Sequence, residues 1–158
     1  MRSVLFGQRQ KANEMRITIY SGAFQDIADQ AKRDSRIRIV AFLRDDYGTT
    51  YNAFYRTRDT NFPSTLEEDY ETVLLPCQSH ARFNETFFIK LPTGDLSSLS
   101  ELYLMFLYQV LPPRSKKKKK GEQGEEPKFE TVAFSVMPLF DSRRGTLIEN
   151  KLHSLFAL

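Results

Sequence analysis

Apolar and polar residues alternate with a period of two along much of this chain. Successive side chains of a β-strand point to opposite faces, so each alternating segment is predicted to be a half-buried strand. The run from Leu102 to Tyr108 is instead almost continuously apolar, which is typical of a buried strand. The four alternating segments are Arg16 to Tyr20, Arg36 to Leu43, Arg82 to Pro92 and Phe129 to Leu139.

Shorter strands and turns fill the intervals between these segments. Short strands are predicted at residues 51–55, 69–75 and 151–158, the second of them closed by Pro76. Turn residues occur at 45–48, 93–95 and 141–145, residues 56–64 are interpreted as a loop, and residues 23–35 as a loop with a short helical turn. Seven or eight strands with little helix predict an all-β fold, an antiparallel β-sandwich.

The length of the chain favours one domain. A chain of 158 residues, 41% of them hydrophobic, is long enough to form one hydrophobic core and too short to form two stable ones. We therefore expect a polar lead-in at residues 1–13, which the pattern assigns to neither helix nor strand, and a single domain at 14–158. No apolar run approaches the roughly 20 residues of a membrane-spanning helix, and the first residues lack the core of a signal peptide. The expected location is cytoplasmic.

A basic loop at residues 111–128 separates two of the predicted strands. Its segment from Arg114 to Lys120 carries six positive charges while the whole chain has a net charge of +3, so the residues outside that segment are net negative. Such a dense block of like charges stays solvated and available to an anion. An inert solvated tip and a nuclear-import signal are alternative interpretations of the same residues. The six are Arg114, Lys116, Lys117, Lys118, Lys119 and Lys120.

Residues for catalysis or metal binding are scarce. One cysteine, Cys77, and two histidines, His80 and His153, cannot complete a zinc site of the usual nitrogen and sulfur ligands. Cys77 and His80 are three residues apart, so in an extended segment they point to opposite sides and do not form a nucleophile–base pair. The sequence also contains no nucleophile elbow, phosphate-binding glycine loop or dinucleotide fingerprint. We predict no enzymatic activity, no cofactor, no metal and no small-molecule substrate.

Three groups of residues, in order along the chain, resemble a known family. The resemblance is to the first DOCK-homology region, the C2-like module of dedicator-of-cytokinesis proteins, and runs from about Asn13 to Leu158. Phe83 stands where the family more often has tryptophan, the chain has no tryptophan, and the lysine tract is long, so the chain resembles a divergent member. A C2 domain of another signalling protein also shares the Asn84 to Phe87 element, which we predict to be structural. The three groups are Asn13 to Phe24; Tyr70 to Val73 with His80 to Thr86 and Lys90 to Pro92; and Ala133 to Leu139 with Gly145 to Leu147.

The resemblance implies a C2-type sandwich of the second topology, with about eight strands and long rim loops. It implies that loops 21–35, 76–82 and 111–128 lie at one end and bind phosphoinositide headgroups, notably phosphatidylinositol 3,4,5-trisphosphate. It also implies peripheral membrane recruitment of a larger exchange-factor chain that acts on Rho-type GTPases. The candidate headgroup-binding residues are Lys32, Arg33, His80, Arg82, Arg114, Lys116, Lys117, Lys118, Lys119 and Lys120.

Calcium is not expected to contribute to this binding. Calcium-dependent C2 domains place several carboxylates on the first and third rim loops, because the ion takes six to eight oxygen ligands. Here the first loop has Asp26, Asp29 and Asp34, but the third is strongly basic. A protein-interaction sandwich with a merely solvated basic loop remains the alternative. Nucleic acid is disfavoured, because no stacking aromatics are interleaved with the lysines.

Overall fold

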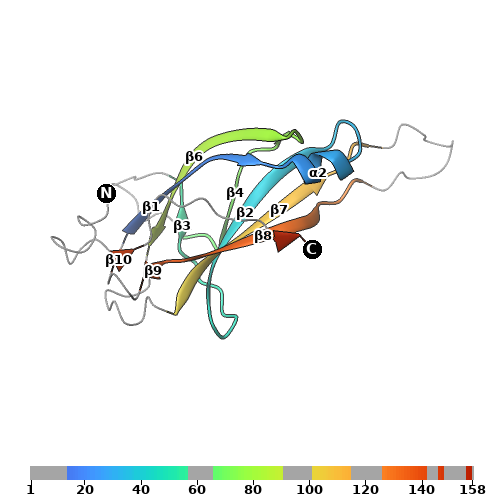
Figure 1. Ribbon diagram of the computed structural model, residues 1–158. Helices are drawn as coiled ribbons and strands as arrows, with labels where there is room; N and C mark the ends of the chain where they lie inside the picture. The colour runs from blue at the N-terminus through green and yellow to red at the C-terminus, as the bar shows by residue number, and fades with distance from the viewer. Residues whose placement is uncertain are drawn as a thin grey trace.

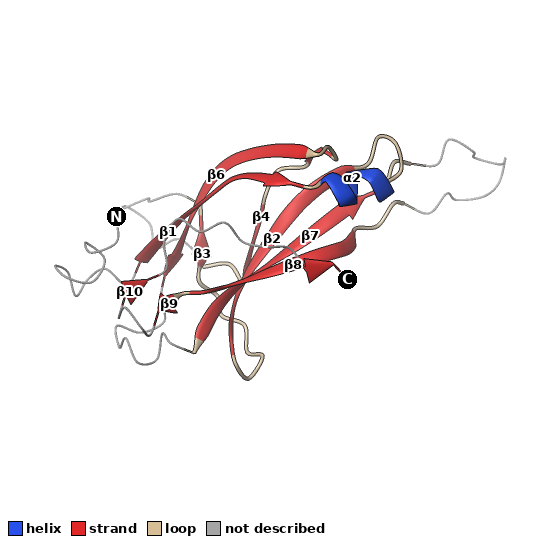
Figure 2. Cartoon of the chain, viewed as in Figure 1, coloured by secondary structure: helices blue, strands red, loops and turns tan. Residues whose placement is uncertain are grey.

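The computed structural model describes residues 14–56, 66–90, 101–114, 126–141, 146–147 and 156–157. These residues form β-strands with one short helix, so the predicted all-β class is confirmed (Figures 1 and 2). The elements are β1 (Glu14–Ala23), α2 (Gln25–Gln30), β2 (Arg36–Asp45), β3 (Phe54–Tyr55), β4 (Asp69–Glu71), β5 (Leu75–Pro76), β6 (His80–Lys90), β7 (Leu102–Leu111), β8 (Glu130–Pro138), β9 (Phe140–Asp141), β10 (Thr146–Leu147) and β11 (Phe156–Ala157).

Two antiparallel sheets make a sandwich. The larger sheet has the strand order β11-β8-β7-β2-β4, with β5 also paired to β2, and the smaller sheet has the order β1-β6-β3. Strands β9 and β10 form a separate pair. The long strands β2 and β7 pair in unbroken register from Arg36–Leu111 to Asp45–Leu102, which makes them the centre of the larger sheet.

The core lies between the sheets and follows the alternation seen in the sequence. On β6, the apolar residues Phe83, Phe87 and Ile89 are buried. The Phe87 ring lies 5.6 Å from the ring of Phe54 and 4.3 Å from that of Tyr70, measured between centroids. The smaller sheet therefore contacts the edge strand of the larger one through stacked aromatic rings.

The predicted strand at residues 69–75 is broken in two, which corrects the sequence interpretation. Glu71 of β4 lies opposite Val40, and Leu75 of β5 lies opposite Ile37. Three residues of this segment therefore face two residues of β2, which is the count of a β-bulge. A hydrophobicity pattern could not reveal the bulge, because its cause is a side-chain hydrogen bond.

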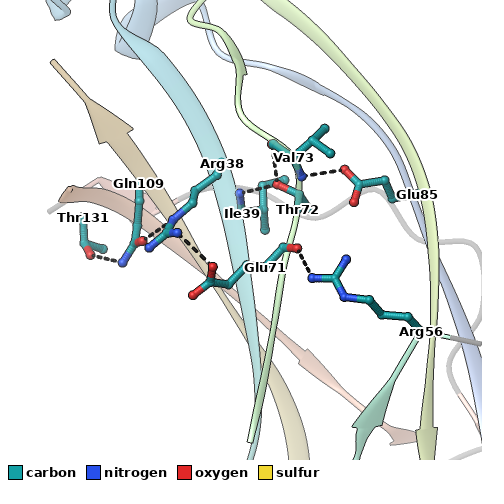
Figure 3. Close-up of polar contacts among 9 residues, drawn as sticks. All are labelled: Arg38, Ile39, Arg56, Glu71, Thr72, Val73, Glu85, Gln109 and Thr131. Atoms are coloured by element: carbon teal, nitrogen blue, oxygen red, sulfur yellow. Dashed lines mark hydrogen bonds and ion pairs between the residues drawn. The ribbon is translucent and has the colours of Figure 1, made fainter. Parts of the chain in front are cut away.

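That hydrogen bond comes from Thr72. The N–H of Ile39 donates to the Thr72 hydroxyl at 2.9 Å, while the N–H of Thr72 donates to the Ile39 carbonyl at 3.0 Å (Figure 3). The N–H of Val73 instead donates to the carboxylate of Glu85 on β6 at 3.0 Å. The residue after Thr72 is thus bonded to the smaller sheet, before β5 pairs with β2 of the larger sheet again.

Strand β6 also contains a bulge, at its middle. Between the pairs Ile19–Glu85 and Ser21–Arg82, two residues of β6 lie opposite one residue of β1. Asn84 has a φ of 50°, in the left-handed region that asparagine tolerates better than most residues. This bulge separates the rim part of β6, which carries His80 and Arg82, from the core-packing part.

The predicted turn at residues 45–48 is confirmed. Gly48 has a φ of 83°, and the Asp45 carboxylate accepts backbone N–H groups of Tyr47 and Thr49, both at 2.9 Å. The Tyr51 hydroxyl donates to the second Asp45 oxygen at 2.8 Å, and this bond is the main reason that the pKa of Asp45 is lowered. The turn closes the end of the sandwich that lies at the C-terminal end of β2.

Several sequence predictions fall outside the described residues. They concern the lead-in at 1–13, most of the loop at 56–64, Leu91 and the turn at 93–95, Lys116 to Lys120, four residues of the turn at 141–145, and most of the last strand. The short strand predicted at 51–55 is present as β3, and the helical turn within 23–35 is present as α2.

Candidate functional site

Three loops that are distant in sequence meet at one end of the sandwich. Arg36, the first residue of β2, pairs with Pro76 on one side and with Leu111 on the other. Ala23, the last residue of β1, pairs with His80, the first residue of β6. We call this end the rim end, defined by residues 23–36, 76–82 and 111–114; it includes α2 and the end of β7 in Figure 1.

Backbone hydrogen bonds fix two of these loops to each other. The N–H of Phe24 donates to the Ser79 carbonyl at 2.7 Å, and the N–H of Cys77 donates to the Ser35 carbonyl at 2.9 Å. Separating the two loops would leave these backbone groups without hydrogen-bond partners, which is unfavourable for buried groups. The two loops are therefore held together. The rim end is therefore built by main-chain contacts and does not depend on its charged side chains.

Phe24 anchors the first loop to the core. Its side chain is buried, and its ring lies 5.6 Å from the ring of Tyr108 on β7. A Cβ atom added to Gly22 would lie 2.1 Å from the tip of the Phe24 ring. Gly22 is thus needed because the aromatic ring folds back over its backbone.

The structure brings five of the predicted headgroup-binding residues to the rim end. Lys32 and Arg33 follow α2, His80 and Arg82 are at the beginning of β6, and Arg114 follows β7; all five are exposed. In the part of the chain that the structure describes, no hydrogen bond or ion pair uses their side chains. These groups are available to an external anion. The other five predicted residues, Lys116 to Lys120, lie outside the described residues.

An open depression lies at the rim end beside β6. Its volume is about 330 Å³, and its lining includes one histidine, one arginine and one glutamine among apolar residues. Its open shape suits a headgroup or side chain presented from outside more than an enclosed small molecule. The lining residues are Leu75, Pro76, Gln78, His80, Ala81 and Arg82.

Two residues of the rim end were missed by sequence reasoning. Gln78 lines the depression together with His80 and Pro76, and Arg36 is exposed where β2 begins. Arg36 was assigned only to the alternation of its strand. The pairing of Arg36 with both Pro76 and Leu111 is a long-range contact, and no local signal in the sequence reveals it.

Arg38 is near the rim end but is already fully engaged. Its guanidinium donates to Gln109 and to Glu71, both at 3.0 Å (Figure 3). The same group lies 3.5 Å from the ring centroid of Phe129. Phe129 directly precedes β8, so this cation–π contact fixes the chain at the point where the basic loop returns to the sheet. Arg38 therefore supports the site and leaves anion binding to its neighbours.

The described residues offer little for metal binding or nucleophilic chemistry. They contain no group of three or more histidine, cysteine, aspartate or glutamate residues that could hold a metal ion. Burial raises the pKa of the Cys77 thiol, which disfavours the thiolate that a nucleophile requires. Of the rim aspartates, Asp29 accepts a hydrogen bond from the Gln25 amide at 2.7 Å.

Comparison with known proteins gives no family assignment. No protein-family model matches the chain, and no curated protein matches it significantly. Among the described residues, no helix has the length and apolar character to cross a membrane. The fold and the geometry of the rim end, together with the sequence resemblance, are therefore the basis for a functional proposal.

Proposed function

We propose that this chain is a non-catalytic membrane-targeting module that binds anionic phospholipid headgroups at its rim end without calcium. The observation that carries the proposal is the convergence of exposed cations from three loops on one end. Arg33, Arg82 and Arg114 come from three different loops, and the pairing of Arg36 with Pro76 and Leu111 holds those loops together.

Phosphoinositides are the proposed ligand class because their phosphates match these donors. A guanidinium offers planar, paired N–H groups to a phosphate, whereas lysine acts as a mobile point charge. Arg82 and Gln78 line the open depression, so a headgroup there has both a charged and a neutral donor. Phosphatidylinositol 3,4,5-trisphosphate, implied by the resemblance, is the specific headgroup to test first.

Lys116 to Lys120 are proposed to contribute affinity for any anionic surface. They follow Arg114 in sequence, separated from it by Ser115 alone, and Arg114 belongs to the rim end. A basic residue near an anionic membrane contributes about 1 kcal/mol, an attraction that decays over a Debye length of about 8 Å at physiological salt. The resemblance adds that the module recruits an exchange factor for Rho-type GTPases from the cytoplasm to the membrane.

Vesicle co-sedimentation tests the proposal. The chain is mixed with neutral phosphatidylcholine vesicles or with the same vesicles containing one phosphoinositide, at low and physiological salt, with and without a calcium chelator. We expect binding only to the anionic vesicles, weaker binding at higher salt, and no effect of the chelator. Arg82→Ala should weaken binding about fivefold, the equivalent of about 1 kcal/mol.

Lys90→Ala is the matched control, because Lys90 is an exposed cation at the opposite end of β6. It should bind vesicles as the unmodified chain does. Binding to no anionic vesicle would overturn the proposal and favour the protein-interaction sandwich. Loss of vesicle binding on chelation of calcium would overturn the calcium-independent part of it.

A further inference from the structure

Among the residues that the structure describes, one long strand forms an edge of the smaller sheet. Strand β1 pairs with β6 and, within the described residues, with no other strand, so it is an edge of the order β1-β6-β3 (Figure 1). An edge strand presents unpaired backbone N–H and C=O groups, which are a template for pairing with another strand. Between residues 15 and 23 this edge carries a single charge, on Arg16, and has no proline or lysine.

The β4 edge of the larger sheet is protected in a way that the β1 edge is not. Around β4 the chain carries four carboxylates, and the bulge at Thr72 interrupts the pairing of this edge with β2. Charges and bulges are the usual means of preventing edge-to-edge association. Of these two edges, β1 is therefore the one better suited to accept a strand. The four carboxylates are Glu67, Glu68, Asp69 and Glu71.

We propose that two copies of this chain associate by antiparallel pairing of their β1 strands about a twofold axis at Thr18. In that register Thr18 lies opposite Thr18 of the second copy, Ile17 opposite its Ile19, and Arg16 opposite its Tyr20. The two smaller sheets then form one continuous sheet. The inference concerns a different surface from the rim end and does not rest on lipid binding.

The sequence of β1 is self-complementary in this register. Met15 is buried, and Ile17 and Ile19 pack against the core, so the isoleucines of both copies meet on the inner face. Arg16 is exposed and Tyr20 is 66% exposed, so on the outer face each guanidinium meets an aromatic ring. Cross-strand aliphatic pairs and cation–π contacts are both favourable, and the twofold axis makes each contact occur twice.

Neighbouring registers lose this match. A shift of one residue places the isoleucines of one copy on the face of the polar residues of the other. A shift that places Ile17 opposite Ile17 puts Arg16 opposite Thr18 and removes both cation–π contacts. Because one strand pair buries less than the roughly 1,200 Å² of a standard stable interface, we expect a weak, concentration-dependent dimer.

Charge changes at Tyr20 test the register without disturbing the core. Sedimentation equilibrium of the full chain, free of lipid, is measured from micromolar to near-millimolar concentration. Tyr20→Lys puts a cation opposite Arg16 and should raise the dimer dissociation constant about tenfold, whereas Tyr20→Glu should lower it several-fold. Tyr47, 85% exposed at the far turn, provides the controls Tyr47→Lys and Tyr47→Glu, which should change nothing.

Cross-linking gives a second, independent measurement. With Cys77→Ser removing the natural thiol, Thr18→Cys should form a disulfide-linked dimer on mild oxidation, because directly opposite strand residues lie within disulfide reach. Tyr47→Cys in the same Cys77→Ser chain should form no disulfide-linked dimer. A chain that stays monomeric at every concentration overturns the proposal, as does a dimer that is insensitive to both Tyr20 changes.

Discussion

The Tyr70 hydroxyl on β4 donates a hydrogen bond of 2.7 Å to Glu85 on β6, and this bond joins the two sheets. The other Glu85 oxygen accepts the N–H of Val73 at 3.0 Å. A single carboxylate of the smaller sheet thus binds both Tyr70 of β4 and Val73 of the bulge that follows it. Glu85 lies on the inner face of β6 among aromatic residues, and these two bonds explain how a charged residue is accommodated there.

Glu85→Gln should lower the free energy of unfolding. The amide keeps the shape of the side chain but has only one oxygen, so its NH₂ group would face either the Tyr70 hydroxyl or the Val73 N–H. Loss of a hydrogen bond to a charged group costs about 1.5–3 kcal/mol. Urea unfolding measures the change, with Glu130→Gln, at an exposed residue of β8, as the control. Equal stability of the Glu85→Gln chain would show that the two sheets do not depend on this contact.

Tyr70 should make the stability fall in alkaline solution. Burial, and next the hydrogen bond to Glu85, raise the pKa of Tyr70 to about 12. Because the folded-state pKa lies above the ordinary value of 10.0, this contribution is fully present below pH 10 and is lost as pH rises toward 12. Tyr70→Phe should flatten the decline in that interval. Unfolding midpoints measured at several pH values test this, and an unchanged slope would contradict it.

Phe87→Ala should cost about 3–5 kcal/mol of stability, the usual range for a large buried aromatic side chain. Phe87 is fully buried and contacts the rings of Phe54 and Tyr70. Phe88→Ala, at the next residue, is the comparison: Phe88 is only partly buried and stacks on Tyr55, so its loss should cost less. Thermal unfolding measures the loss of stability of each variant. If the Phe87→Ala chain melts at the same temperature as the unmodified chain, the assignment of Phe87 to the core is wrong.

Gly22→Ala should displace Phe24 and loosen the first rim loop. The added methyl group cannot fit 2.1 Å from the ring, so the ring must leave its contact with Tyr108. Phe24→Ala alone should also destabilise the chain, by leaving a cavity. In the double variant the clash disappears, so its loss of stability should be smaller than the sum of the two single losses. Strict additivity would mean that the ring and the glycine are not coupled.

The sequence predicted what depends on local pattern and missed what depends on distant contacts. The alternation of apolar and polar residues identified both β2 and β6 as strands. It could not find the break after β4, because a Thr72 hydroxyl and a Glu85 carboxylate there replace main-chain partners. It identified the exposed cations at Arg33 and Arg82 but missed Arg36, whose place at the rim end depends on pairing with two distant strands.

Replacing Lys116 to Lys120 with serine should separate affinity from selectivity. Five lysines contribute at most about 5 kcal/mol to attraction by an anionic surface, less the conformational entropy lost when the loop docks and the repulsion of the acidic residues that follow. Charges on flexible stems discriminate poorly between headgroups, so the serine variant should bind all anionic vesicles more weakly by a similar factor. Arg33→Ala and Arg82→Ala should instead chiefly reduce the preference among phosphoinositides.

Co-sedimentation with a panel of phosphoinositide vesicles measures both effects. If the serine variant binds every vesicle as the unmodified chain does, the lysines are only a solvated tip and their proposed contribution to membrane affinity is wrong.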